Sequence, residues 1–176
     1  MKNLFIISSI SASGKTTLVE HIIKKFDLYK LKTCTTREIR EEESGDEYHF
    51  LSMADFTKMF RKDKFIEHAN VYGEQYGLTK DEVENNSDKD CILITDVKGA
   101  ATLTDLYPRA ISIFIEPPDM EEIIKRLTSR KTGDFTNRYL EAEKELKAMG
   151  SYDHVLKVGN LDEMKENLEK LIKNFI

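Results

Sequence analysis

Residues near the start of the chain combine the types and the spacing that bind a phosphate group. Gly14, Lys15 and Thr16 stand together after small polar residues and before a helical pattern with Leu18 and Ile22 on one face. Backbone N–H groups of such a loop, and of the helix that follows it, point at an anion. Lys15 can reach the β- and γ-phosphates of a nucleotide, and the Thr16 hydroxyl can ligate Mg²⁺. We therefore predict a phosphate-binding loop.

The match to the phosphate-loop pattern is incomplete at its first position. The pattern places a glycine five residues before Gly14, where this chain has Ser9. Ala12 and Ser13 are small enough for a phosphate to approach the backbone closely, and Thr17 continues the pattern into the helix. An ordinary serine-rich turn between a strand and a helix is the alternative for this stretch taken alone.

Two other stretches carry charged side chains that could act with this loop. Arg37 and Arg40 lie three residues apart in the polar run 34–47. This spacing suits an anion site, but such a run is also typical of a solvated loop. Asp96 ends an apolar run that begins at Cys91 and predicts a buried strand. In a phosphate-loop fold that acid belongs near Mg²⁺ or a substrate, although many strands end in Asp for turn reasons.

The elements that must position these residues alternate along the chain. The main strands are expected at 4–7, 31–33, 91–96, 110–115 and 154–158, and the helices at 15–26, 97–107, 119–130, 137–149 and from Asn160 onward. Alternation of this kind predicts an α/β fold, in which a parallel sheet is flanked by helices in three layers. Substrates are then expected at the carboxyl ends of the strands, near Gly14 and Asp96.

The region 34–89 follows a different pattern and is interpreted as an inserted subdomain. Its strands, at 48–50, 66–71 and 74–77, are short and mostly antiparallel in pattern. Ser52 and Thr79 each stand where a helix N-cap is expected. We therefore expect one domain over 1–176, with this small mixed α+β unit inserted into a core at 1–33, 90–127 and 150–176.

Composition excludes several classes of function. A net charge of -5 over 176 residues argues against a general nucleic-acid binder or a membrane-surface binder. Cys34 and Cys91 have no metal-ligand or redox spacing, so they indicate reduced thiols of a cytoplasmic protein. The N-terminal apolar run is too short for a signal peptide or a membrane span.

Taken in order, these motifs resemble the guanylate kinase family, a group of phosphate-loop nucleoside monophosphate kinases. The resemblance rests on nine segments, at 11–18, 35–40, 45–50, 65–69, 73–77, 96–100, 113–118, 125–130 and 138–146. It implies phosphoryl transfer from MgATP to GMP, and to dGMP, giving ADP and GDP in purine nucleotide metabolism. ATP and GMP would be the partners and Mg²⁺ the cofactor, while the protein could be a monomer or a homodimer.

The resemblance also implies roles for particular residues on the GMP side. The subdomain at 34–89 would bind GMP. The phosphate of GMP would be held by Arg37, Arg40, Tyr48 and Tyr76. Glu67 would accept hydrogen bonds from the guanine N1–H and 2-amino group, and Thr33 would lie near O6. Asp96 would lie between GMP and the metal.

On the ATP side, the resemblance implies that residues 12–17 hold the phosphates and that Thr16 ligates Mg²⁺. The segment 128–149 would be a helical lid with its helix. The implied catalytic residues are Lys15, Asp96, Arg126, Arg130 and Arg138. The three arginines would surround the transferring phosphoryl group, whose charge spreads over its oxygens in the transition state.

The chain departs from the family at several positions. Leu78 stands where the family usually has a hydroxyl residue that faces the base. It either loosens the grip on guanine or packs into the subdomain core. The acidic loop residue of the family could be Glu42 or Glu43. Ile94 stands where the family often has Asp, and Val158 where an Asn near the adenine is common.

Two other functions are compatible with the same fold. One is a non-catalytic guanylate-kinase-like module that binds proteins, and the other is a kinase for another phosphorylated small molecule, such as a ribose bisphosphate. Retention of Lys15, Thr16 and the arginines favours catalysis over the scaffold, and Glu67 together with Tyr76 favours guanine.

Overall fold

A central sheet of five strands sets where a ligand can bind. The computed structural model describes residues 1–10, 15–41, 43–71, 73–116, 135–157 and 160–176. Its central strands are β1 (Asn3–Ser9), β2 (Tyr29–Lys30), β7 (Asp90–Ile94), β8 (Ile111–Glu116) and β9 (His154–Lys157). They pair in the order β2-β7-β1-β8-β9, and each neighbouring pair is parallel. Because β1 lies between β7 and β8, its carboxyl end is the topological switch point at which open α/β sheets bind ligands.

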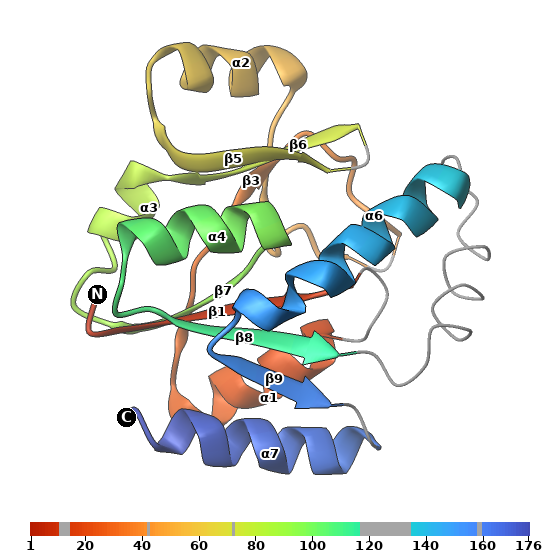
Figure 1. The fold of residues 1–176 in the computed structure, drawn as a ribbon. Coiled ribbons are helices and arrows are strands. Elements are labelled where there is room, and N and C mark those ends of the chain that lie inside the picture. Colours follow the sequence, from red (N-terminus) through yellow and green to blue (C-terminus); the bar gives the residue numbers. More distant parts are fainter. Residues whose placement is uncertain (11–14, 42, 72, 117–134, 158–159) are drawn as a thin grey trace.

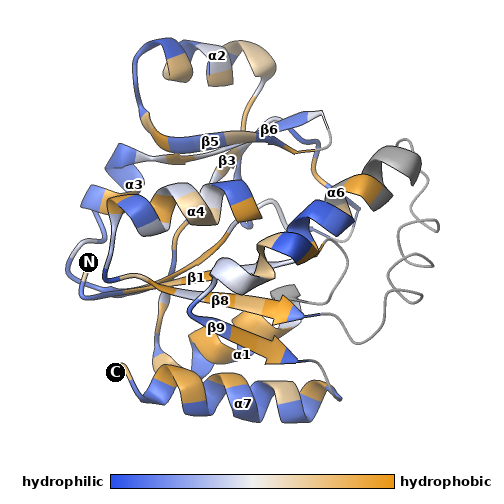
Figure 2. Cartoon of the chain, in the orientation of Figure 1, coloured by the Kyte–Doolittle hydropathy of each residue, from blue (hydrophilic) through white to orange (hydrophobic). Residues whose placement is uncertain are grey.

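Helices cover both faces of this sheet, as Figure 1 shows. Helices α1 (Lys15–Phe26) and α7 (Leu161–Lys173) lie on one face. On the other lie α4 (Val97–Leu106) and α6 (Phe135–Lys147), which runs into a 3₁₀ turn, η1 (Ala148–Ser151). Figure 2 shows that the central strands are strongly hydrophobic, as expected for a sheet buried on both faces. The predicted three-layer α/β fold is confirmed.

The amphipathic pattern of the last helix explains how α7 packs. Met164, Leu168 and Ile172 recur at helical spacing and are buried in one core cluster with Leu18 and Ile22 of α1. Asn160 caps this helix, which was predicted from Asn160 onward, because its side-chain oxygen accepts hydrogen bonds from the N–H groups of residues 162 and 163. Burial of this stripe fixes α1, and with it the start of the predicted phosphate loop's helix.

A second, mixed sheet lies beside the first (Figure 1). Its strands are β3 (Cys34–Thr35), β4 (His49–Phe50), β5 (Phe65–Val71) and β6 (Glu74–Thr79), in the order β4-β3-β6-β5. The β3–β6 and β5–β6 pairs are antiparallel, and β3–β4 is parallel. Helices α2 (Met53–Arg61) and α3 (Lys80–Glu84) accompany it. The hydroxyls of Ser52 and Thr79 cap them at 3.1 and 3.2 Å, as predicted.

The predicted strand at 31–33 is wrong. The chain pairs with β7 through β2, which ends at Lys30, and enters the second sheet at Cys34. Between them, the Leu31 N–H donates to the Ile92 carbonyl at 3.0 Å, and the Thr33 carbonyl accepts from His49 N–H at 2.9 Å. Residues 31–33 therefore carry the chain from one sheet to the other.

The other predicted elements fall near their expected bounds, except where they lie outside the described residues. The helix expected at 119–130 lies among residues 117–134, which are outside the described part. The helix expected at 137–149 is α6 followed by η1. None of the helices in the described part of the chain is long and apolar enough to cross a membrane.

Candidate functional site

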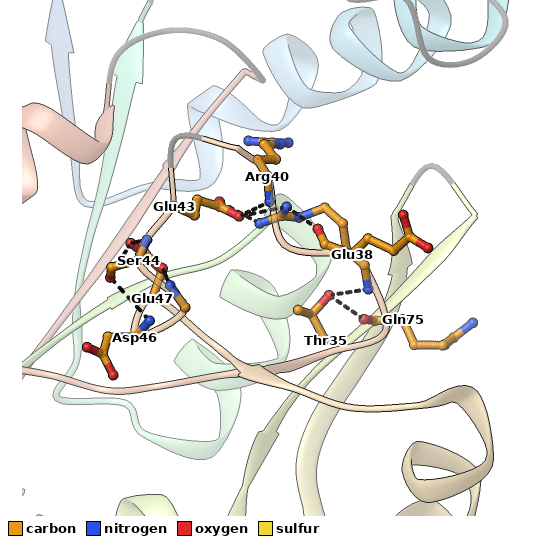
Figure 3. Close-up of polar contacts among 10 residues, drawn as sticks. Thr35, Glu38, Arg40, Glu43, Ser44, Asp46, Glu47 and Gln75 are labelled. Carbon is orange, nitrogen blue, oxygen red and sulfur yellow. Dashed lines mark hydrogen bonds and ion pairs between the residues drawn. The ribbon is translucent and has the colours of Figure 1, made fainter.

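An ion pair between Arg37 and Glu43 organises the loop that follows β3. Arg37 donates from Nη2 to Glu43 Oε1 at 2.7 Å and from Nη1 to Oε2 at 3.0 Å. The Arg40 N–H donates to the same Oε2 at 2.9 Å, while its side chain extends away from the carboxylate (Figure 3). Both paired side chains are only 13% exposed. The solvated-loop alternative therefore does not describe Arg37, although Arg40 is exposed.

The pKa values of this pair keep both partners charged at neutral pH. Burial alone would lower the pKa of Arg37, but its hydrogen bond to Glu43 and nearby charges raise it above the usual range. Burial alone would raise the pKa of Glu43, but the hydrogen bond from Arg37 brings it below its usual range. A guanidinium fork that grips a carboxylate in this way has the geometry to grip a phosphate.

Short contacts hold the two ends of the same loop. Thr35 Oγ1 donates to the Gln75 carbonyl on β6 at 3.0 Å and accepts from the Arg37 N–H at 3.1 Å. At the other end, the Glu47 carboxylate accepts from the N–H groups of Ser44 and Gly45, each at 3.0 Å (Figure 3). These backbone hydrogen bonds, that of Ser44 foremost, lower the pKa of Glu47 to about 2. The loop is therefore anchored to the mixed sheet.

Aromatic rings surround the Arg37 guanidinium. Its Cζ lies 5.4 Å from the ring centroid of Tyr48 and 5.6 Å from that of Phe50. The Tyr48 and Tyr76 rings meet edge to face at 6.0 Å. Burial, and then the neighbouring Tyr76, raise the pKa of Tyr48, so its hydroxyl stays protonated and can donate a hydrogen bond. Arg37, Glu43, Tyr48 and Tyr76 are called the Arg37 cluster below.

A buried carboxylate lies where the mixed sheet meets α4. Glu67, on β5, is only 6% exposed, and it packs against Gly99 in the first turn of α4. Burial, and then the charge of Asp96, raise the pKa of Glu67 to about 7. No described residue donates a hydrogen bond to this carboxylate, and an ionised carboxylate without donors is costly to bury. A ligand that brings N–H groups would remove that cost.

Asp96 caps α4, which is the structural role that the sequence left as one of two alternatives. Its Oδ1 caps α4 by accepting from the N–H groups of Lys98 at 2.7 Å and Gly99 at 3.0 Å. Its Oδ2 accepts no hydrogen bond from the described residues, so it remains available to a ligand or a metal. Thr33 lies in the connection between the two sheets, and the residue is buried, with 6% of its surface exposed.

Leu78 packs into a core rather than facing an open base site. It is fully buried in a cluster with Leu4, Ile6, Leu93 and Leu103. The cluster joins β6 of the mixed sheet to the central sheet and to α4. Leu78 therefore packs in a core, as one of the two alternatives expected, although this core lies between the two sheets and not within the subdomain alone.

The predicted phosphate loop is described only at its two ends. β1 ends at Ser9 and α1 begins at Lys15, so the strand and the helix that flank the predicted loop lie where they were predicted. Ala12, Ser13 and Gly14 lie outside the described residues, as do the side chains of Lys15 and Thr16, while Thr17 is exposed. Arg126, Arg130 and Val158 are also outside the described part. Arg138 belongs to α6, but its side chain is not described.

Two groups of predicted residues therefore belong to the mixed sheet and the loop that follows its strand β3. The Arg37 cluster can bind an oxyanion, and Glu67 can accept hydrogen bonds from a heterocycle that carries N–H donors. Tyr76 and Glu67 lie on adjacent strands, β6 and β5. A ligand with a phosphate at one end and paired N–H groups at the other suits this arrangement.

Sequence reasoning missed three contributors to the site. Phe50 lies against Arg37, and Gly99 and Thr95 lie beside Glu67. The one available signal was Gly99, because glycine lowers helix stability and its presence inside a helical pattern often has a packing reason.

Comparisons with known proteins extend along nearly the whole chain. A family model described as guanylate kinase matches residues 1–175. A guanylate kinase of Dechloromonas aromatica (strain RCB) is 34% identical over 178 residues, covering 97% of this chain and 88% of the relative. A guanylate kinase from Thermotoga maritima is 31% identical, and the match covers 97% of this chain and 86% of the relative. A crystal structure of guanylate kinase from Anaplasma phagocytophilum matches with a TM-score of 0.79 and 27% identity, covering 98% of this chain and 85% of that one.

Proposed function

The chain belongs to the guanylate kinase family, and we propose that it transfers the γ-phosphoryl group of ATP to GMP, giving ADP and GDP in purine nucleotide metabolism. The observation that carries this proposal is the pairing of Glu67 with the Arg37 cluster. The two sets of groups complement the two ends of GMP, since guanine presents N–H donors and the phosphate presents an oxyanion.

The Arg37 cluster and Arg40 are proposed to bind the GMP phosphate. The Glu43 carboxylate already occupies the fork of Arg37 at 2.7 and 3.0 Å, so an incoming phosphate would share or replace that contact. The hydroxyls of Tyr48 and Tyr76 can donate to further phosphate oxygens. Arg40 is exposed and its guanidinium extends from the loop (Figure 3), which suits closure onto a bound anion.

Glu67 is proposed to read the guanine base. Its two oxygens can accept hydrogen bonds from N1–H and the 2-amino group, a pair that adenine lacks. A buried charged acceptor rejects a ligand that leaves it unpaired, because desolvation then has no compensation. Thr33, buried close to where β3 begins, is proposed to approach the guanine O6.

The ATP side is proposed from the phosphate loop and the lid. Residues 12–17 would hold the ATP phosphates through backbone N–H groups, with Lys15 on the β- and γ-phosphates. Arg126, Arg130 and Arg138, from a lid at 128–149, would surround the transferring group. We propose that the chain divides accordingly into a core at 1–33, 90–127 and 150–176, and a GMP-binding subdomain at 34–89.

Mg²⁺ fits the available protein oxygens. The free Oδ2 of Asp96 and the Thr16 hydroxyl would hold the ion together with ATP phosphates. Magnesium commonly binds through one or two protein oxygens plus phosphates and water, and it neutralises phosphate charge when bound. Among the described residues, no group of three or more His, Cys, Asp or Glu side chains could hold a metal by itself. This donor set therefore suits a metal that arrives with the nucleotide.

The transfer itself needs positioning and charge stabilisation more than a general base. An oxygen of the GMP phosphate forms a bond to the γ-phosphorus while the bond from that phosphorus to the β–γ bridging oxygen breaks. The attacking oxygen is already ionised, so no proton has to be removed from it. Arg37 orients the acceptor, and Lys15 with the lid arginines stabilises charge on the transferring oxygens.

Location and acceptor range belong to the same proposal. Both cysteines are unpaired and buried, which suits a reducing compartment, and we propose the cytoplasm. Because none of the assigned contacts involves the ribose 2′-hydroxyl, dGMP is proposed as a second acceptor.

A coupled assay of ADP formation tests the proposed function. Purified protein is supplied with Mg²⁺, ATP and, in turn, GMP, dGMP, AMP, CMP, UMP and ribose 1,5-bisphosphate. We expect rapid ADP formation with GMP and dGMP only. Turnover with a different acceptor would support the same-fold alternative, and no acceptor-dependent turnover would support a binding module; either result would overturn the proposal.

A further inference from the structure

Gly99 leaves the space that the Glu67 carboxylate occupies. A Cβ atom at position 99 would lie 3.0 Å from Glu67 Oε2 and 3.2 Å from its Cδ, and it would overlap the Thr95 hydroxyl. Glycine within a helix is less stabilising than alanine, so helix formation does not explain glycine here. The close approach of Glu67 and Thr95 does explain it.

The wall against which Glu67 packs is held in place. Asp96 Oδ1 binds the N–H groups of Lys98 and Gly99, which fixes the first turn of α4. Glu67 is 6% exposed, so its carboxylate cannot turn aside into solvent. Any atom added at position 99 must therefore move the carboxylate or the helix.

We propose that Gly99 is a positioning residue that determines the selectivity for guanine, by letting the Glu67 carboxylate lie flush against α4 with both oxygens aimed at the base. This inference rests on the proposed function. Two parallel hydrogen bonds require both oxygens near the plane of the base, and hydrogen bonds weaken steeply when they are misaligned. A displacement of a few tenths of an ångström would spoil one of the two bonds.

The inference predicts a selective defect in the Gly99→Ala variant. Inosine monophosphate keeps N1–H but lacks the 2-amino group, so the ratio of GMP affinity to inosine monophosphate affinity reports the second hydrogen bond. We expect GMP affinity to fall about tenfold and this ratio to narrow, since a hydrogen bond to a charged group is lost. ATP affinity, measured by calorimetry, should stay at the parent value.

Two control variants separate this role from a purely structural one. Gly150→Ala in η1 adds a methyl group where no atom lies within 4 Å, and it should bind as the parent does. Thr95→Ala/Gly99→Ala removes the overlap with the Thr95 hydroxyl but keeps the 3.0 Å contact with Glu67 Oε2. Its melting temperature should rise above that of Gly99→Ala. Its ratio of GMP affinity to inosine monophosphate affinity should still be narrower than that of Thr95→Ala alone.

The outcomes distinguish the inference from the function on which it rests. Suppose that Glu67→Gln narrows the ratio of GMP affinity to inosine monophosphate affinity. An unchanged ratio in folded Gly99→Ala, or a parent-like ratio in the double variant, would then overturn the role of Gly99. A parent that binds GMP and inosine monophosphate equally, or an unaltered ratio in Glu67→Gln, would overturn the assignment of Glu67 itself and the Gly99 inference with it.

Discussion

Two carboxylates of the site have opposite electrostatic surroundings. Glu43 accepts both arms of Arg37, and this bond holds its pKa below the usual range. Glu67 has no such partner among the described residues, and burial raises its pKa to about 7. Glu43 is therefore ionised throughout the neutral range, whereas Glu67 gains or loses a proton close to pH 7. Of the two acidic residues that the sequence left open, Glu43 makes this contact, and Glu42 lies outside the described residues.

The raised pKa of Glu67 predicts pH-dependent GMP binding. Only the ionised carboxylate accepts both guanine hydrogen bonds, and its pKa without ligand is about 7. Below that pH a proton must leave before GMP binds, so affinity should fall as pH decreases, by up to about tenfold per unit. Calorimetric titration with GMP between pH 5.5 and 8.5 measures this pH dependence of the affinity.

The control for this titration is Glu67→Gln. The phosphate of GMP also titrates, with a second pKa of about 6, and the variant keeps that contribution while removing the carboxylate. The pH dependence above 6.5 should disappear in the variant. Equal pH profiles for the parent and Glu67→Gln would show that Glu67 does not bind the base in its ionised form.

Arg40 is predicted to act through its guanidinium fork rather than its charge alone. Arg40→Lys keeps a positive charge but loses the planar pair of donors. We expect the KM for GMP to rise about tenfold, since one hydrogen bond between charged groups is lost. The KM for ATP should not change. Steady-state kinetics with each substrate varied in turn decide this, and an unaltered KM for GMP would return Arg40 to the solvated loop.

At the scale of elements, β6 connects the two sheets through its side chains. The side chain of Leu78, on β6, packs against Leu4, Ile6 and Leu93 of the central sheet. Glu82 adds a polar link, because its Oε1 accepts from the N–H of Lys32 in the connection between the sheets at 2.9 Å. These contacts hold the mixed sheet, which carries the Arg37 cluster, against the central sheet.

Replacing Leu78 should therefore reduce stability rather than improve guanine binding. Leu78→Ser removes a buried side chain and buries a hydroxyl, at a cost of about 3 kcal/mol or more. The melting temperature should fall by roughly 6 °C or more. Leu78→Met preserves volume and should cost less than about 1.5 kcal/mol. Tighter GMP binding by Leu78→Ser with an unchanged melting temperature would instead favour a role at the base.

Much of the fold could be predicted because local signals agreed with each other. The Ser52, Thr79 and Asn160 caps and the apolar runs of β7 and β8 each have a local cause. The prediction of a strand at 31–33 was wrong because a single apolar residue in a short run does not show which of two sheets the chain joins at that point. Leu31 is buried and bonds to Ile92, yet it belongs to no strand.

The site was predictable in its residue types and not in its contacts. Arg37 and Glu67 were expected to bind opposite ends of one ligand. The contact of Arg37 with Glu43 depends on the conformation of a single loop, and the contact of Glu67 with Gly99 depends on the packing of β5 against α4.

At the scale of the whole molecule, the proposed reactants are bound by different parts of the chain. GMP would contact the mixed sheet and α4, and ATP the loop between β1 and α1. Figure 1 shows the mixed sheet and α2 standing beyond α4 on one side of the central sheet. A site assembled from separate parts requires them to approach before transfer, and closure excludes water from the reacting phosphoryl group.

Closure predicts compaction when both sites are filled. Small-angle scattering should give a smaller radius of gyration with a bisubstrate analogue, in which guanosine and adenosine are joined by phosphates, than without it. ATP alone should produce less compaction, since it lacks the base that meets Glu67. Identical radii with and without the analogue would contradict closure.

The central claim is that Glu67 selects guanine for a phosphoryl transfer from ATP. The most direct measurement is kcat/KM for GMP and for AMP as acceptors, by ADP formation, in the parent and in Glu67→Gln. The parent should prefer GMP by at least about a thousandfold, because AMP leaves a buried acceptor unpaired. The variant should narrow that preference by about tenfold or more. A parent without preference for GMP, or a preference that Glu67→Gln leaves unchanged, would contradict the account.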